Sequence, residues 1–223
     1  MSPSTLLVIF VSGLLAMAAW SRLAELYRKS ALSRAAVALG MRFEETAGRF
    51  ITGGPGNHPL FRAGGAVGRH LVTDGGVALF EHLSRAPSAG GMWRTVGAAK
   101  VGAMPSFRLE FKRPGVFGLA GSAYTPADEV ALDVPDAFSD RYQLFSDDPY
   151  GTRALFNDAV VAFFVANGGY CVESRAGWLV VDEGIGPMDP GALAKQLDAV
   201  RKVAALFDAA STVEASPSPT LTA

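Results

Sequence analysis

The chain has 223 residues, which suits one domain or two small ones and is long enough to bury a core. Its formal net charge is -1, so no overall field attracts nucleic acid, and Cys171 is the single cysteine, so no intramolecular disulfide can form. Hydrophobic residues make up 49% of the sequence, and an apolar N-terminal run accounts for part of that high share.

The N-terminal run has the length and composition of a membrane span. Residues 1–21 contain no charged side chain, and Trp20 lies where an interfacial aromatic residue belongs. A bilayer core requires about 20 apolar residues in a helix, and the stretch from Pro3 to Ser21 is just long enough. A core helix would show a polar face with a period of 3.6 residues, whereas only Ser12 and Gly13 interrupt this run. We therefore expect a transmembrane helix over residues 1–21.

Two other features bear on the fate and orientation of this helix. Ala16 to Ala18 resembles a small-x-small cleavage site, but the first five residues lack the Lys or Arg of a signal peptide. The basic residues that follow the run are Arg22, Arg28, Lys29 and Arg34. Because such clusters stay cytoplasmic, we expect an uncleaved signal anchor in the inner (plasma) membrane, with the rest of the chain in the cytoplasm. An exported protein with a cleaved signal peptide is an alternative.

The helix is expected to continue beyond the membrane over residues 22–40. Apolar residues recur at helical spacing from Leu23 to Leu39, and Gly40 is a typical stop. The basic side chains near its start would lie beside the lipid head groups, where each gains about 1 kcal/mol from an anionic leaflet. Membrane lipid is therefore a predicted partner.

Residues 41–210 are predicted to form a cytoplasmic α+β domain made of antiparallel hairpins. A hairpin is expected from residues 70–73 and 77–80 around Asp74 to Gly76, followed by a strand over 93–101. The stretch 105–111 alternates, which predicts that Phe107, Leu109 and Phe111 are buried and that Arg108 and Glu110 face outward.

The C-terminal half is predicted to carry two amphipathic helices. We expect short strands over 130–132 and 142–145, one helix from Pro149 to Asn167, and a second hairpin from 170–173 and 178–181. A final helix follows Pro190, with Leu193 and its apolar successors facing inward. A break near 113–125 would divide the domain into two lobes, and residues 211–223 are expected to be a disordered tail.

Several short patterns resemble a bacterial family of membrane-anchored proteins of unknown function. They are Met104 to Glu110, of the type Pro-x-Phe-Arg-Leu, and Phe138 to Phe145, of the type Phe-Ser-x-x-Tyr-x-Leu, with Asp147, Asp148 and Ala154 to Phe156 after them. The resemblance covers about residues 95–210. It departs after Leu109, where the family pattern has Arg-Pro-Glu and this chain has Glu110 to Lys112. It implies the membrane anchor and the fold, and it implies no catalytic residue.

The histidines and acidic residues do not form a recognisable metal motif. The histidines are His58, His70 and His82, and the pair Glu81-His82 lacks a second ligand at a useful spacing, so a polar strand face is expected there. The acidic run Asp128, Glu129, Asp133, Asp136 and Asp140 lacks the spacing of a calcium loop, so we expect a solvated surface. Gly64 to Gly68 is not followed by Lys-Ser or Lys-Thr, so a turn is expected rather than a phosphate loop.

No sequence pattern indicates a catalytic nucleophile or a nucleic-acid-binding surface. No serine lies in a Gly-x-Ser-x-Gly pattern, and Cys171 falls within a predicted strand, where a buried thiol is expected. A basic group with interleaved aromatic residues comprises Arg94, Lys100, Arg108, Lys112 and Arg113 with Trp93, Phe107 and Phe111. Alternation across a sheet would turn those rings into the core, so no nucleic-acid partner is expected.

The sequence as a whole favours a non-catalytic interaction or scaffolding module on a single-pass membrane anchor. No residue is singled out as catalytic, cofactor-binding or metal-binding, and no cofactor is predicted. A protein partner is expected without being identified. The alternative is an enzyme that uses Asp or His groups of the cytoplasmic domain.

Overall fold

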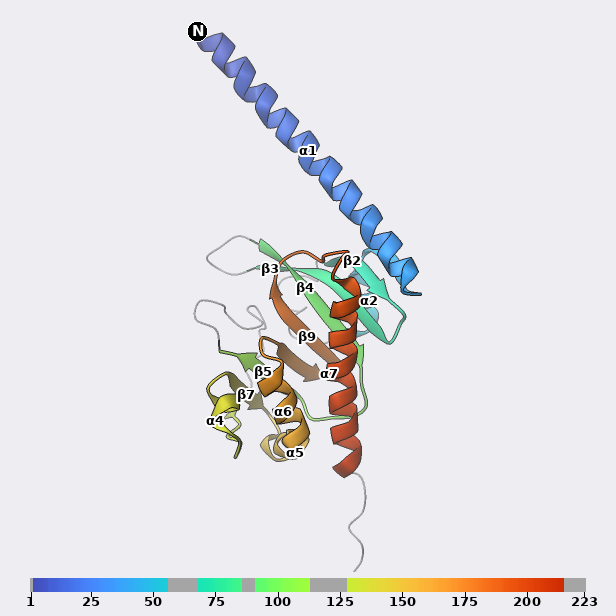
Figure 1. The fold of residues 1–223 in the computed structure, drawn as a ribbon, viewed down its shortest axis with the longest axis vertical. Helices are drawn as coiled ribbons and strands as arrows, with labels where there is room; N and C mark the ends of the chain where they lie inside the picture. Colours follow the sequence, from blue (N-terminus) through green and yellow to red (C-terminus); the bar gives the residue numbers. More distant parts are fainter. Residues whose placement is uncertain (1, 56–67, 86–90, 113–127, 215–223) are drawn as a thin grey trace, which may run out of the picture.

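The computed structural model describes residues 2–55, 68–85, 91–112 and 128–214. It shows a long apolar N-terminal helix attached to a domain with one antiparallel sheet and several helices, which confirms the predicted α+β class (Figure 1). The expected break near 113–125 lies outside the described residues.

The N-terminal helix α1 runs without interruption over Pro3–Ala38. Ser2 caps it by accepting a hydrogen bond from the Thr5 amide, and Pro3 occupies the first turn, where its missing N–H leaves no helical bond unmade. Within the described residues α1 is the one helix long and apolar enough to cross a membrane. Figure 1 shows it projecting from the domain, whereas its last turns pack on the domain through Leu32 and Ala36.

The sheet has nine strands in the order β1-β2-β3-β4-β9-β8-β5-β7-β6, and each neighbouring pair is antiparallel. The strands are β1 (Arg42–Thr46), β2 (Gly68–Thr73), β3 (Val77–Arg85), β4 (Gly91–Lys100), β5 (Phe107–Phe111), β6 (Asp128–Glu129), β7 (Tyr142–Ser146), β8 (Cys171–Arg175) and β9 (Trp178–Ile185). Pairing of β4 with β9 joins strands from the two halves of the chain into one sheet.

Both predicted hairpins are confirmed, and each turn has a local cause. In the β2–β3 turn the Asp74 carboxylate accepts hydrogen bonds from the amides of Gly76 and Val77. In the β8–β9 turn Ala176 and Gly177 have φ values of 53° and 76°. Positive φ at both central residues is the requirement of the tight turn that matches the twist of paired strands.

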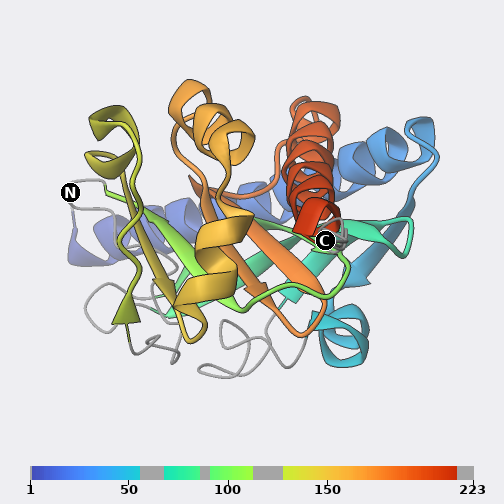
Figure 2. The same ribbon diagram turned by 90° about the horizontal axis from the view of Figure 1, so that it is seen from below.

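The helices are distributed unevenly over the two faces of the sheet. Figure 2 shows the end of α1, α7 (Leu193–Glu214), α4 (Asp136–Ser139) and α6 (Asp158–Ala166) on one face, and α2 (Gly48–Gly53) on the other. Helix α5 (Pro149–Leu155) contributes Leu155 to the core of the first face. The first face holds the larger core, where the ring of Phe107 packs 5.2 Å from that of Phe156 and 5.0 Å from that of Phe207. On the other face, Ile51 and Phe50 cover Phe80.

Three predicted elements differ from the structure. The single helix expected over 149–167 is two helices, because Phe156 leaves helical geometry and the Asn157 side chain caps a new start at the amides of Ala159 and Val160. The strand expected over 130–132 is replaced by β6, although the Val130 amide still donates to the Leu144 carbonyl. Helix α7 continues to Glu214, so residues 211–214 are helical and not part of a tail.

Candidate functional site

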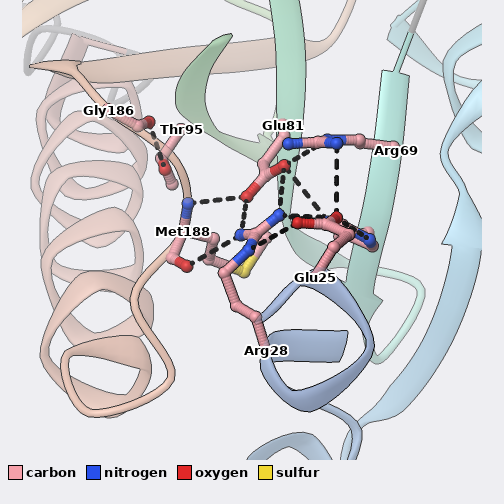
Figure 3. Close-up of polar contacts among 8 residues, drawn as sticks. Glu25, Arg28, Arg69, Glu81, Thr95, Gly186 and Met188 are labelled. Atoms are coloured by element: carbon pink, nitrogen blue, oxygen red, sulfur yellow. Dashed lines mark hydrogen bonds and ion pairs between the residues drawn. The ribbon is translucent and has the colours of Figure 1, made fainter. Parts of the chain in front are cut away.

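Five charged or titratable side chains meet where α1 crosses the sheet, and we call this cluster the charged junction. It consists of Glu25 and Arg28 from α1, Arg69 and His70 from β2, and Glu81 from β3. Glu25 and Arg28 are three residues apart, so they share the face of α1 that lies against the domain. Figure 3 shows Arg28 reaching from α1 to Glu81, with Arg69 approaching the same carboxylate from β2.

Glu81 is the centre of the junction, and its side chain is fully buried. Its Oε2 accepts a hydrogen bond from Arg69 Nε at 2.6 Å and from Arg28 Nη2 at 3.2 Å, while its Oε1 accepts from the Met188 amide at 2.8 Å and from Arg28 Nη1. Burial alone would raise the pKa of Glu81, but the hydrogen bonds from His70 and Arg28 and the charge of Arg28 outweigh it and lower the pKa to about 2. The carboxylate is therefore ionised at every physiological pH.

The surrounding groups complete the network. Arg28 also bonds both oxygens of Glu25 and donates to the Met188 carbonyl at 3.2 Å, which fixes the loop between β9 and α7. Arg69 lies 4.0 Å above the Trp93 ring, a cation–π geometry. His70 has a φ of 52° at an irregularity in the β2–β3 register, and its Nδ1 lies 3.1 Å from Glu81 Oε2. A register irregularity of this kind re-aims a side chain, here toward the junction.

The junction fixes the direction of α1 relative to the sheet. Two carboxylates face two guanidinium groups, so the charges of Glu25, Glu81, Arg28 and Arg69 balance. Removal of one partner from a buried pair leaves a charge without compensation, at a cost of about 3 to 5 kcal/mol. The junction and the buried side chains of Leu32 and Ala36 together pack the C-terminal part of α1 on the domain, and the apolar part continues from it as one helix.

Sequence reasoning expected the basic residues after the apolar run to lie beside lipid, and the structure corrects this for Arg28. Arg28 turns into the domain, and Lys29 pairs with Glu45 of β1. The sequence feature that could have indicated a buried arginine is Glu81, since a carboxylate inside the apolar strand from Val77 to Leu83 requires a buried cationic partner.

The Glu81-His82 pair is divided between the two faces of the sheet. Successive strand residues point in opposite directions, so His82 lies on the face away from α1. Burial, together with the nearby charge of Arg94, lowers the pKa of His82 to about 4, so this histidine is neutral at pH 7. Across the described ranges no three His, Cys, Asp or Glu side chains are grouped as metal ligands. His58 and residues 64–67 of the glycine stretch lie outside those ranges.

A second set of buried charged side chains lies on the sheet face that carries His82. Arg94 pairs with Asp182 at 2.5 Å, and burial raises the pKa of Glu173 to about 7 against the opposing charges of Arg108 and Arg175. The prediction that Arg108 and Glu110 face outward is wrong: the side chains are 13% and 23% exposed and pair with each other. Because β5 pairs with β8, Arg108 lies directly opposite the buried Glu173.

The other residues that the sequence singled out differ in their burial. Phe107 and Leu109 are fully buried and Phe111 is partly buried. Cys171 is buried, as predicted, and burial raises the pKa of its thiol to about 11. In the basic group Lys100 and Lys112 are exposed, and Arg113 lies outside the described residues. Of the acidic run Glu129, Asp133, Asp136 and Asp140 are exposed.

These features define a class: an α+β sheet protein with one helix suited to a membrane, docked on the sheet through buried charges. No protein-family model and no curated protein matches the sequence. The fold is similar to the crystal structure of the mycobacterial trehalose monomycolate transport factor A, TtfA, with a TM-score of 0.51 and 16% identity over 86% of this chain and 98% of that one. At this identity the similarity shows a shared fold and transfers no residue role.

Proposed function

We propose that this protein is a non-catalytic, single-pass component of a membrane-embedded transport assembly. In this role α1 is the anchor and the α+β domain presents a surface to partner proteins. The observation that carries the proposal is that α1 runs without a break from its apolar part into the charged junction. The apolar part is long enough for a bilayer, and none of its most apolar window is buried against the domain.

The rigid attachment supports a role in assembly. A domain on a flexible linker samples many orientations, and a partner must then offset the entropy of ordering it. Here Glu81 receives hydrogen bonds from α1, from β2 and from the loop before α7, so the domain is held in one orientation relative to α1. Such a domain is pre-organised for partners that lie in the same membrane.

The fold similarity to TtfA supports the proposal that the assembly transports a lipid. TtfA is by name a transport factor for trehalose monomycolate, and it shares the fold over most of both chains. We carry over the role of transport factor with a lipid as the class of cargo, and not the particular lipid. The basic residues after the apolar run, among them Arg22 and Arg34, support a cytoplasmic position for the domain.

Complementation of a deletion strain tests this proposal. Envelope lipids are quantified in cells that carry the wild-type protein, a variant with residues 3–21 replaced by an unrelated apolar span, or a variant with ten Gly/Ser residues inserted between Ser21 and Arg22. Deletion should cause a lipid to accumulate on the cytoplasmic side. The unrelated span should restore transport because it retains the junction. The insertion should fail to restore it although the protein stays in the membrane fraction.

Two outcomes would contradict the proposal. Full restoration by residues 22–223 without a span would show that anchoring is dispensable. Full restoration by the Gly/Ser insertion would show that the rigid connection between span and domain has no role.

A further inference from the structure

Helix α1 and the edge strand β1 enclose an open groove of about 430 Å³ just beyond the apolar part of the helix. Its lining combines two cations, Lys29 and Arg34, two hydroxyls, Ser30 and Ser33, and two apolar side chains, Leu26 and Phe43. Leu26, Ser30 and Ser33 follow the three- and four-residue spacing of one helix face, so they line the groove together.

The charge of the groove matches that of a single phosphodiester. Lys29 pairs with Glu45, which also lines the groove, and Arg34 Nη1 donates to Ser30 Oγ at 3.0 Å. Two cations and one carboxylate leave a net charge of +1, the complement of one negative charge. Arg34 is exposed, so its guanidinium group is accessible to an anion.

The groove lies at the level expected for lipid head groups. Each helical residue rises 1.5 Å, so Lys29 lies about 3 Å and Arg34 about 10 Å beyond Tyr27, while the head-group layer extends about 5 to 8 Å from the hydrocarbon. Leu23, Leu26 and Tyr27 are 46%, 61% and 68% exposed, so apolar surface continues past Ser21. Contact with lipid as far as Tyr27 would cover this surface and place the membrane boundary beside the groove.

We propose that this groove binds the head group of an anionic phospholipid from the adjoining leaflet. The phosphate pairs with Arg34 and Lys29 and accepts hydrogen bonds from the two serine hydroxyls, while the glycerol region packs against Leu26 and Phe43. This inference rests on the membrane anchoring of the proposed function. It adds a second point of attachment, which would fix the rotation of α1 about its own axis.

Lipid retention by the full-length protein tests the groove. The protein is reconstituted into nanodiscs of equal phosphatidylcholine and phosphatidylglycerol, extracted in mild detergent, and its co-purifying lipids are quantified by mass spectrometry. The wild-type protein should retain phosphatidylglycerol selectively. Arg34→Gln should lower that selectivity about fivefold, which corresponds to the roughly 1 kcal/mol that one cation gains at an anionic surface.

Two further variants test whether lipid selectivity depends on the groove itself or on the positive charge of α1 in general. Ser33→Leu narrows the groove without changing charge and should lower selectivity as Arg34→Gln does. Arg22→Gln removes an exposed cation from the same helix outside the groove, so it measures the effect of general charge and should lower selectivity less than Arg34→Gln does. Equal retention of both lipids by the wild type, or equal losses for Arg22→Gln and Arg34→Gln, would overturn the proposal. Displacement of the lipid by added inorganic phosphate would also overturn it in favour of a free anion.

Whether the protein enters the nanodiscs distinguishes a failure of this inference from a failure of the proposed function. A protein that fails to enter the discs contradicts both. A protein that enters the discs but shows no lipid preference contradicts the groove alone.

Discussion

Arg28 of α1 and Glu81 of β3 lie 53 positions apart in the sequence and form a two-point ion pair at the base of the apolar helix. Both guanidinium Nη groups of Arg28 contact the carboxylate, and the same arginine holds Glu25 and the Met188 carbonyl. One side chain therefore links α1, the sheet and the loop that precedes α7. The orientation of the domain relative to α1 depends on this contact.

Glu81→Gln should destabilise the full-length protein by about 3 kcal/mol, because it leaves the half-buried guanidinium groups of Arg28 and Arg69 without their shared carboxylate. Urea unfolding in detergent micelles measures the change. Glu25→Gln is the matched control, since the Glu25 side chain is 38% exposed and its loss should cost less than about 1 kcal/mol. Equal losses for the two variants would mean that Glu81 is not the centre of the junction.

Two buried groups on the opposite face should give pH dependences of opposite sign. His82 has a pKa of about 4 against an ordinary 6.5, so the folded protein binds fewer protons and stability rises with pH between these values. Glu173 has a pKa of about 7 against an ordinary 4.5, so the folded protein binds more protons and stability falls as pH rises through that interval. Each difference corresponds to about 3 kcal/mol, so the two contributions nearly cancel.

Removing one of the two groups should reveal the pH dependence of stability that the other contributes. Thermal unfolding of the wild type should vary little between about pH 4.5 and 6.5. His82→Gln should become less stable as pH rises through that range, and Glu173→Gln should become more stable. If both variants keep the flat profile of the wild type, neither group has the protonation state described.

Gly97 of β4 provides space for α7. A Cβ atom at this position would lie 2.2 Å from Cγ2 of Val200. Gly97→Ala should therefore destabilise the protein by about 1 to 3 kcal/mol through overpacking. Val200→Ala removes the obstructing methyl groups, so the double variant should be more stable than the sum of the single changes predicts. Strict additivity in this double-mutant cycle would show that α7 shifts freely over the sheet.

Phe107 should be among the most costly residues to truncate, because its ring is fully buried between Phe156 and Phe207. We expect Phe107→Ala to cost about 3 to 5 kcal/mol in urea unfolding. Tyr150→Ala is the control, since Tyr150 is 82% exposed and its loss should be within about 0.5 kcal/mol. Arg108→Ala should fall between the two, and a loss as small as that of Tyr150→Ala would contradict its enclosure beside Glu173.

The anchor should be retained and should orient the domain to the cytoplasm. The protein should stay in membranes after a carbonate wash, with an intact N-terminus by mass spectrometry. A phosphatase fused after Glu214 should be inactive and a fluorescent protein at the same site should work. A mature form that begins at Ala19 would identify a cleaved signal, and high phosphatase activity would reverse the orientation.

Local signals determined much of the fold. The charge-free run with Trp20 at its end indicated a helix suited to a membrane, and the structure contains it as part of α1. The turn residues Asp74 to Gly76 and Ala176-Gly177 act on their own backbone, so both hairpins could be located from sequence. The stripe from Leu193 to Leu206 likewise predicted the inward face of α7.

The charged sites depended on contacts between distant segments, which sequence periodicity does not specify. Alternation placed Arg108 on the face opposite Phe107, but only the pairing of β5 with β8 set it against Glu173. Helical spacing put Arg28 near the membrane, but only the path of α1 across β3 brought it to Glu81. A periodic pattern tells which residues share a face. Whether that face meets water, lipid or a buried carboxylate is decided by long-range packing, because the free energy of a charge depends on its surroundings in space.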